Sequence, residues 1–215
     1  MNTVLITKPI EVNSRLHELG VSEEILRSAV EAGERARLGC TANHPRMTPG
    51  FVGWSDTVKL LRDRLIPEKW TKHDTGGLPT VVHPKGMISI AVTTGDEGTG
   101  IETRELRSKY SKGSATAALV EVNHTQLGFD EEILGPRLFK KPSGTILTWY
   151  LVIRRLADEI RFELSLPSGL SENGQVAEWK ERILFAPITL DDDAVKIDNT
   201  IEEVDDIVVE VTRKF

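Results

Sequence analysis

The stretch TILTWYLVIRRLADEIRFELSL (residues 145–166) decides the fold of this chain. Residues 145–154 are rich in β-branched and aromatic side chains, a composition typical of a buried strand. A turn at Ala157 and Asp158 follows, and from Ile160 to Leu166 apolar side chains alternate with polar ones. This alternation predicts a second strand that buries one face. The two runs therefore predict neighbouring antiparallel strands.

Further strands are expected on both sides of this pair. Residues 80–83 and 87–93 read as a hairpin whose turn is Pro84-Lys85-Gly86. Residues 175–184 fit a helix or a strand equally well, and residues 207–211 alternate as in a final strand. A short helix is expected at 114–122, and residues 123–144 and the acidic run 191–193 are expected to be irregular.

The first 70 residues are predicted to be helical after a short strand or extended arm at 1–12. Asn13 or Ser14 can cap a first helix that Gly20 ends, and Ser22 can cap a second one. The second and third helices are indicated by apolar side chains at helical spacing, separated by a loop at 39–53. These side chains are Ile25, Ala29, Ala32 and Ala36, and then Trp54, Val58, Leu61 and Leu65.

Helices that precede strands predict an α+β fold, with N-terminal helices packed on a mainly antiparallel sheet. We expect an N-terminal helical segment at 1–70 and a mainly antiparallel α+β body at 71–215, joined as one compact unit. The chain has 215 residues, of which 39% are hydrophobic. Both values are ordinary for a folded globular protein.

Composition and charge indicate the cellular compartment and argue against some classes of partner. The net charge of -6 argues against a protein whose main role is to coat nucleic acid. One cysteine, Cys40, excludes an intramolecular disulfide. The first ten residues do not resemble a signal peptide, and the longest apolar run is too short to cross a membrane. We therefore expect a cytoplasmic protein without a membrane partner.

The segment TRELRSKYSKG is the strongest candidate binding site, because it combines cations, hydroxyls and an aromatic ring. Such a surface suits phosphate, nucleic acid or an acidic protein. The alternative is a solvated loop, which charged runs often form. The candidate binding residues are Arg104, Arg107, Lys109, Tyr110 and Lys112.

A metal-dependent nuclease or phosphoesterase is an alternative. The glycine-rich loop TTGDEGTG (93–100) carries Asp96 and Glu97, and Glu163 lies on a strand. Carboxylates at strand ends can hold Mg²⁺, which would then be the cofactor. The acid-x-lysine spacing of many nucleases is absent, because Ser165 follows Glu163 at that distance. A polar turn between strands is the simpler interpretation of the loop, and no other cofactor is expected.

Residues 13–33 also fit a helix-turn-helix pattern, which makes a transcriptional regulator the second alternative. Ser22 would cap the recognition helix, and Arg27 would contact a phosphate or a base. Glu23 and Glu24 oppose this interpretation, because carboxylates repel DNA.

Several segments resemble a family of uncharacterised bacterial proteins that is loosely associated with mobile genetic elements. The segments are 41–53, 79–100 and 163–167, together with Trp179 and 181–183, and the resemblance would cover most of the chain. That family has no assigned activity, so the resemblance implies no catalytic residues. We expect a non-catalytic binding or regulatory protein of mobile-element or defence type that contacts a protein or a nucleic acid. Whether it is also an enzyme, and in which oligomeric state, stays open.

Overall fold

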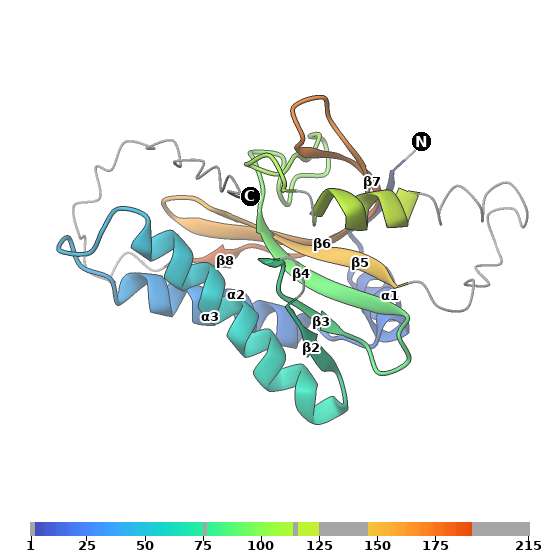
Figure 1. The fold of residues 1–215 in the computed structure, drawn as a ribbon, viewed down its shortest axis with the longest axis horizontal. Coiled ribbons are helices and arrows are strands. Elements are labelled where there is room, and N and C mark those ends of the chain that lie inside the picture. The colour runs from blue at the N-terminus through green and yellow to red at the C-terminus, as the bar shows by residue number, and fades with distance from the viewer. Residues whose placement is uncertain (1–2, 75–76, 114–115, 125–145, 191–215) are drawn as a thin grey trace, which may run out of the picture.

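The computed structural model describes residues 3–74, 77–113, 116–124 and 146–190. The expected α+β architecture is confirmed: helices pack on a mostly antiparallel sheet of eight strands, in the order β1-β7-β6-β5-β4-β3-β2 with β8 beside β6 (Figure 1). The strands are β1 (Val4–Ile6), β2 (Thr71–His73), β3 (Thr80–Val82), β4 (Ile88–Thr94), β5 (Leu147–Arg155), β6 (Glu159–Leu170), β7 (Val176–Leu184) and β8 (Ile188–Thr189). The named helices are α1 (Pro9–Leu19), α2 (Glu23–Leu38), α3 (Thr48–Leu65) and the 3-10 helix η1 (Ile66–Glu68).

Among the described strands, two pairs are parallel and join segments that lie far apart in the chain. β4 runs parallel to β5, and β1 runs parallel to β7. A parallel pair needs a crossover connection. Between β4 and β5 this connection includes the loop 95–113 and a helical stretch at 116–124. The carboxyl ends of β4 and β5 therefore point to the same edge of the sheet.

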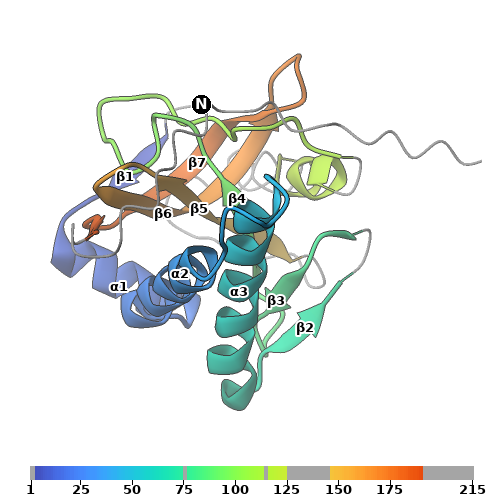
Figure 2. The ribbon, with the colours of Figure 1, turned by 90° about the vertical axis from the view of Figure 1, so that its left-hand side faces the viewer.

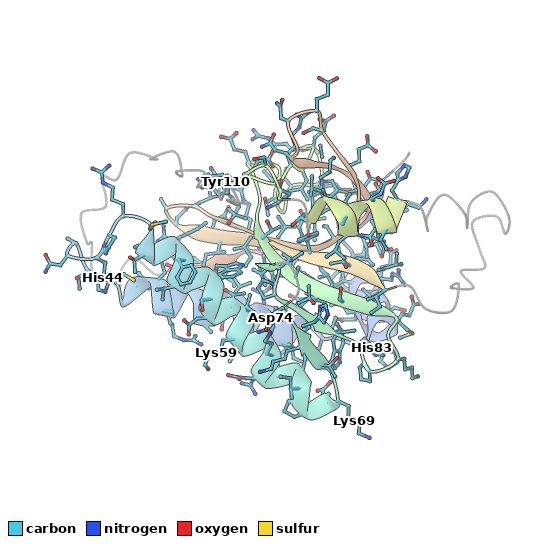
Figure 3. All side chains as sticks on the ribbon, in the orientation of Figure 1. His44, Lys59, Lys69, Asp74, His83 and Tyr110 are labelled. Atoms are coloured by element: carbon cyan, nitrogen blue, oxygen red, sulfur yellow. The ribbon has the colours of Figure 1, made fainter. Side chains whose placement is uncertain are left out.

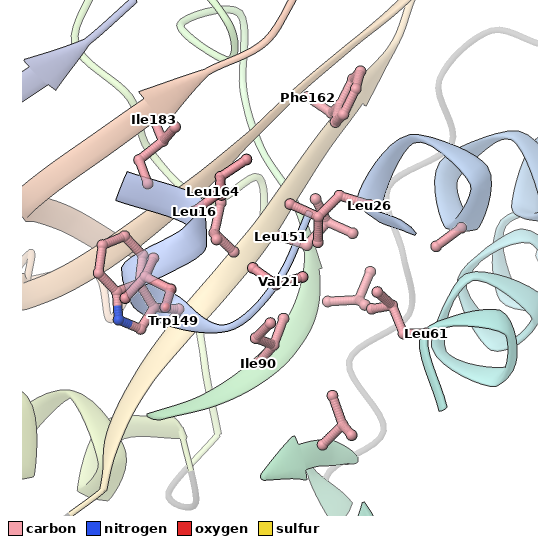
Figure 4. Close-up of a cluster of buried hydrophobic side chains, with 14 of the residues drawn as sticks. Leu16, Val21, Leu26, Leu61, Ile90, Trp149, Leu151, Phe162, Leu164 and Ile183 are labelled. Atoms are coloured by element: carbon pink, nitrogen blue, oxygen red, sulfur yellow. The ribbon is translucent and has the colours of Figure 1, made fainter. Parts of the chain in front are cut away.

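The sheet separates two hydrophobic cores. α1, α2 and α3 cover one face, and the helical stretch at 116–124 lies over the other (Figure 2). In the larger core, Leu16, Leu26 and Leu61 of the helices meet strand side chains such as Ile90 and Leu164 (Figure 4). The N-terminal helices α1, α2 and α3 therefore share the larger core with the sheet.

Two glycines let α2 and α3 approach each other closely. A Cβ on Gly33 would lie 2.2 Å from Thr57 Oγ1 and 2.5 Å from the carbonyl oxygen of Gly53. Real Cβ contacts are never so short, so the crossing of the two helices requires glycine at position 33. This close packing brings the ends of α2 and α3 together beside the sheet.

Buried Asn123 fastens the 116–124 stretch to the sheet. Its Nδ2 donates to the carbonyl oxygens of Thr148 (2.9 Å) and Pro167 (3.0 Å), and its Oδ1 accepts from the Thr148 amide (3.0 Å). The regular pairing of β5 with β6 begins at Tyr150 and Ser165, so Asn123 replaces strand hydrogen bonds where Pro167 has no amide to give.

Several predicted boundaries require correction. The first helix begins at Pro9 instead of at Asn13 or Ser14, because proline suits the first helical turn. α3 begins at Thr48, inside the expected loop at 39–53. Gly20 and Ser22 cap helices as predicted, and residues 176–184 are a strand. The expectations for 191–193 and 207–211, and most of 123–144, lie outside the described residues.

Candidate functional site

The loop 95–113 is anchored to the sheet by a buried ion pair. Glu163 of β6 is fully buried and Arg182 of β7 is 4% exposed. Arg182 donates from Nε to Glu163 Oε1 (2.8 Å) and from Nη2 to Oε2 (2.7 Å). The same guanidinium donates to the carbonyl oxygens of Arg104 and Gly98. The ion pair therefore holds the loop as well as the two strands.

The glycine-rich part of this loop binds the protein's own carboxylates. The Gly100 amide donates to Glu163 Oε2 (2.7 Å), while Asp96 Oδ1 accepts from the amides of Gly98 and Arg107 (3.0 Å each). A Cβ on Gly98 would lie 1.8 Å from the carbonyl oxygen of Glu105. Glycine is thus required where the two arms of the loop touch, which accounts for the motif without a phosphate.

The three candidate metal ligands Asp96, Glu97 and Glu163 do not form one site. Glu163 uses both oxygens in the contacts above, and Ser165 Oγ also donates to its Oε1 (2.6 Å). Glu97 is exposed and its Oε2 lies 3.5 Å from Arg104 Nη1. Within the described ranges, no group of three or more histidine, cysteine, aspartate or glutamate side chains is placed to hold a metal ion.

The five candidate binding residues fall into two groups. Arg104 and Arg107 are at least half exposed, and Lys109 Nζ lies 5.3 Å from the ring centroid of Tyr110. These four side chains face outward or line the cavity described below. Lys112 instead turns inward, and its Nζ donates to Thr93 Oγ1 at 2.5 Å. Burial lowers the pKa of Lys112 from its ordinary 10.5 to about 8.

A cavity of about 260 Å³ lies where α2 and α3 meet the carboxyl ends of β4 and β5. Lys109 and Tyr110 line it from the loop, and Tyr110 is seen above the start of α3 in Figure 3. Trp54 lines the same cavity, and its indole Nε1 donates to the Val92 carbonyl at 3.3 Å. Open α/β sheets commonly bind ligands beyond the carboxyl ends of their parallel strands.

One carboxylate holds two guanidinium groups in this cavity. Glu34 is 8% exposed, and it accepts from Nε and Nη2 of Arg37 (2.9 Å each). Arg155 Nε donates to both oxygens of Glu34 at 3.0 and 3.2 Å. Burial alone would raise the pKa of Glu34, but the hydrogen bonds and charges of the two arginines hold it below its ordinary value. We name Glu34, Arg37 and Arg155 the cavity triad.

Exposed apolar side chains lie at the start of α3, the helix from which Gly50 and Trp54 line the cavity. Met47 is 67% exposed and Phe51 is 63% exposed. The ring of Phe51 lies 5.8 Å from that of Trp54, centroid to centroid. Tyr110 is 39% exposed across the cavity. Exposed aromatic rings beside arginines are typical of protein-binding surfaces.

A larger groove of about 470 Å³ lies between α3 and the β2–β3 edge, and four of the five charged side chains that line it form ion pairs with one another. Lys59 binds Asp63 at 2.7 Å, and Arg62 binds Asp74 at 2.5 Å. Since four of its charged side chains are already paired in this way, the groove is the weaker candidate for binding a charged group.

The residues of the helix-turn-helix alternative have structural contacts. Ser22 Oγ accepts from the Ile25 amide at the start of α2. Arg27 donates to Glu23 and to the Ala186 carbonyl, and its guanidinium lies 5.0 Å from the Phe162 ring centroid. Both side chains therefore support the packing of α2. None of the helices in the described ranges combines the length with the apolar character that a membrane-spanning segment needs.

Comparison with protein-family models, with curated proteins and with solved structures gives no match to this chain. The function must therefore be inferred from the residues of the cavity and the loop. Sequence reasoning found Lys109 and Tyr110 but missed the cavity triad. Only the spacing of Glu34 and Arg37, three residues apart in one helix, was visible in the sequence, because Arg155 lies 121 positions away from Glu34.

Proposed function

We propose that this chain is a non-catalytic regulatory protein that binds a protein partner through the surface around the cavity. The surface comprises the apolar and basic side chains of Phe51, Trp54, Arg107, Lys109 and Tyr110, hereafter the cavity surface. The observation that carries the proposal is the exposure of two aromatic rings beside the cavity. Tyr110 lines the cavity, and the ring of Phe51 lies 5.8 Å from that of Trp54, which lines it too. Aromatic and arginine side chains dominate the energetics of protein interfaces.

Charge supports a protein partner over a nucleic acid. The chain carries a net charge of -6. Arg104 and Arg107 each lie 3.5 Å from a glutamate, Glu97 and Glu105, so their charges are partly neutralised. Binding to nucleic acid depends on many unopposed cations. A protein partner that presents apolar side chains beside an acidic group can pack against the aromatic rings and form an ion pair with the basic side chains.

The resemblance to bacterial proteins of mobile elements suggests the setting. We place the chain there as an inhibitor or regulator in mobile-element or defence biology. The candidate catalytic carboxylates Asp96 and Glu163 make structural hydrogen bonds, which supports a role without catalysis. A binding protein needs only a stable surface, and the anchored loop 95–113 supplies one.

Affinity purification from the native host, with and without nuclease, tests the proposal. The parent chain is compared with the double variant Phe51→Ala/Tyr110→Ala and with Ile10→Ala, which removes an exposed apolar side chain elsewhere. We expect a stoichiometric protein with the parent and with Ile10→Ala, and roughly 10- to 100-fold weaker capture with the double variant. Undiminished capture by the double variant would contradict the cavity surface. Material that disappears with nuclease would show a nucleic-acid partner and overturn the proposal.

A further inference from the structure

We infer that the cavity is a socket for one carboxylate, supplied by an acidic side chain of the protein partner. The inference rests on the proposed function and names the chemistry that the cavity surface recognises. It starts from charge. The charged side chains that line the cavity are Glu34, Arg37, Lys109 and Arg155, which are three cations and one carboxylate. Within the cavity triad, one carboxylate is shared by two guanidinium groups, so the triad keeps a positive charge.

The hydrogen bonds of the triad leave one nitrogen of each guanidinium group available to a ligand. Arg37 binds Glu34 through Nε and Nη2, and Arg155 binds it through Nε while its Nη1 donates to the Leu156 carbonyl. Arg37 Nη1 and Arg155 Nη2 make no hydrogen bond within the described part of the chain. A guanidinium held by a carboxylate on one side can bind a second oxyanion with its remaining N–H groups.

The ion pairs of Glu34 hold the two arginines in place before a ligand binds. The side chain of Arg37 is 18% exposed and that of Arg155 is 38% exposed, whereas Glu34 is 8% exposed. Glu34 therefore holds both guanidinium groups in a fixed orientation, so these side chains lose little conformational entropy when a ligand binds. The apolar walls, which include Val30, Val92 and Ile153, suit the aliphatic stem of an acidic side chain.

The volume limits the size of the ligand. About 260 Å³ is below the roughly 300–1,000 Å³ of pockets that enclose drug-sized molecules. A carboxylate on a short aliphatic stem suits a space of this size. Inorganic phosphate has the same capacity for bidentate contacts, so phosphate is the competing ligand that the test must separate from carboxylate.

The test is a titration of the purified full chain with propionate, with its neutral isostere propionamide and with inorganic phosphate, at constant ionic strength. NMR signals of the Trp54 indole N–H and of Nε–H in Arg37 and Arg155 report on the cavity. We expect propionate to shift these signals saturably, with a Kd on the order of 1–10 mM. Propionamide should cause no saturable shift. Binding of phosphate without propionate would overturn the assignment of carboxylate.

Variants separate the socket from general charge effects. Arg155→Met should weaken binding of propionate at least tenfold, and Lys109→Met, which leaves the cavity triad intact, should weaken it severalfold. Arg62→Met removes a cation from the groove beside α3 and is the matched control, with no change expected. Equal binding by Arg155→Met, Lys109→Met and the parent would overturn the inference.

The outcomes also separate this inference from the proposed function. Saturable binding of propionate together with capture that is insensitive to Phe51→Ala/Tyr110→Ala would show that the partner binds elsewhere than at the cavity surface, and would leave the cavity as an anion site. Capture that depends on those rings, with no response to propionate, would leave the partner and remove the socket.

Discussion

The carboxylate of Glu163 and the guanidinium of Arg182 face each other across β6 and β7, with Oε2 2.7 Å from Nη2 and Oε1 2.8 Å from Nε. Both side chains are buried, and the pair also holds the carbonyl oxygen of Gly98 and the amide of Gly100. Two strands and a long loop therefore depend on one ion pair. Removal of one partner leaves a buried charge without compensation.

Glu163→Gln is expected to lower the free energy of unfolding by about 3–5 kcal/mol. Denaturation by urea measures the loss, and Glu121→Gln on the exposed side of the 116–124 stretch is the control. The structure also predicts that Mg²⁺ does not raise the melting temperature through Glu163, because both carboxylate oxygens are occupied. A Mg²⁺-dependent rise that Glu163→Gln abolishes would support the nuclease alternative instead.

Lys112→Met should stabilise the protein at neutral pH. The pKa of Lys112 is about 8 in the folded chain and 10.5 when unperturbed. Between these values the unfolded chain holds a proton that the folded chain has lost, so the free energy of unfolding of the parent rises with pH across this window. At pH 7 the charged ammonium is a cost, and its removal should add about 1–3 kcal/mol.

This gain should shrink as the pH rises from 8 to 10.5, because the folded parent then no longer carries the buried charge, while its unfolded chain still does. Urea denaturation of parent and variant at several pH values measures the difference. Lys85→Met, at an exposed turn, controls for the loss of a lysine. A gain that grows with pH would mean that the inward-facing ammonium of Lys112 is not the destabilising group.

Asn123→Ala should detach the 116–124 stretch from the sheet. The substitution leaves the amide of Thr148 and the carbonyl of Pro167 buried without Asn123, at an expected cost of about 2–4 kcal/mol. Hydrogen exchange should show faster exchange of the Thr148 amide than in the parent. His124→Ala, one residue further on an exposed position, should leave this amide protected. Unchanged exchange in Asn123→Ala would refute the anchoring role.

Gly33→Ala and Gly50→Ala should act in opposite directions, although both replace a helical glycine. A Cβ at Gly33 meets Thr57 and Gly53, so α2 and α3 must separate at a cost of about 1–3 kcal/mol. At Gly50 no atom lies within 4 Å of the added Cβ, and lower chain entropy should stabilise the fold by about 0.5 kcal/mol. Thermal denaturation measures both, and a stable Gly33→Ala variant would contradict the close helix crossing.

Much of the fold could be predicted from local patterns in the sequence. α3 could be predicted because Trp54, Val58, Leu61 and Leu65 recur at helical spacing. Its start could not, because Pro49 and Gly50 are also typical of loops. β7 was ambiguous for a different reason. Glu181 and Arg182 are ion-paired within the fold, with Arg15 and Glu163, and these charges obscure the alternation of a strand.

The candidate site was less accessible to sequence reasoning. Exposed Lys109 and Tyr110 could be found because they stand in a local run of polar residues. The cavity triad could not, because the partners Glu34 and Arg155 are brought together only when α2 packs beside the end of β5. Likewise, Glu163 resembled a surface carboxylate until the contact with Arg182 placed it in the interior.

The parallel pairing of β1 with β7 has a consequence for synthesis of the chain. Val4 lies opposite Glu181, 177 positions further along. At a synthesis rate of roughly 5–20 residues per second, the partner strand is completed roughly 10–35 s after β1 has been made. Until then the backbone of β1 has no strand to pair with, and unpaired strands with apolar side chains such as Val4 and Leu5 can associate with other chains. β1 therefore joins the sheet late in translation. A nascent chain that ends before β7 offers β1 no strand with which to pair.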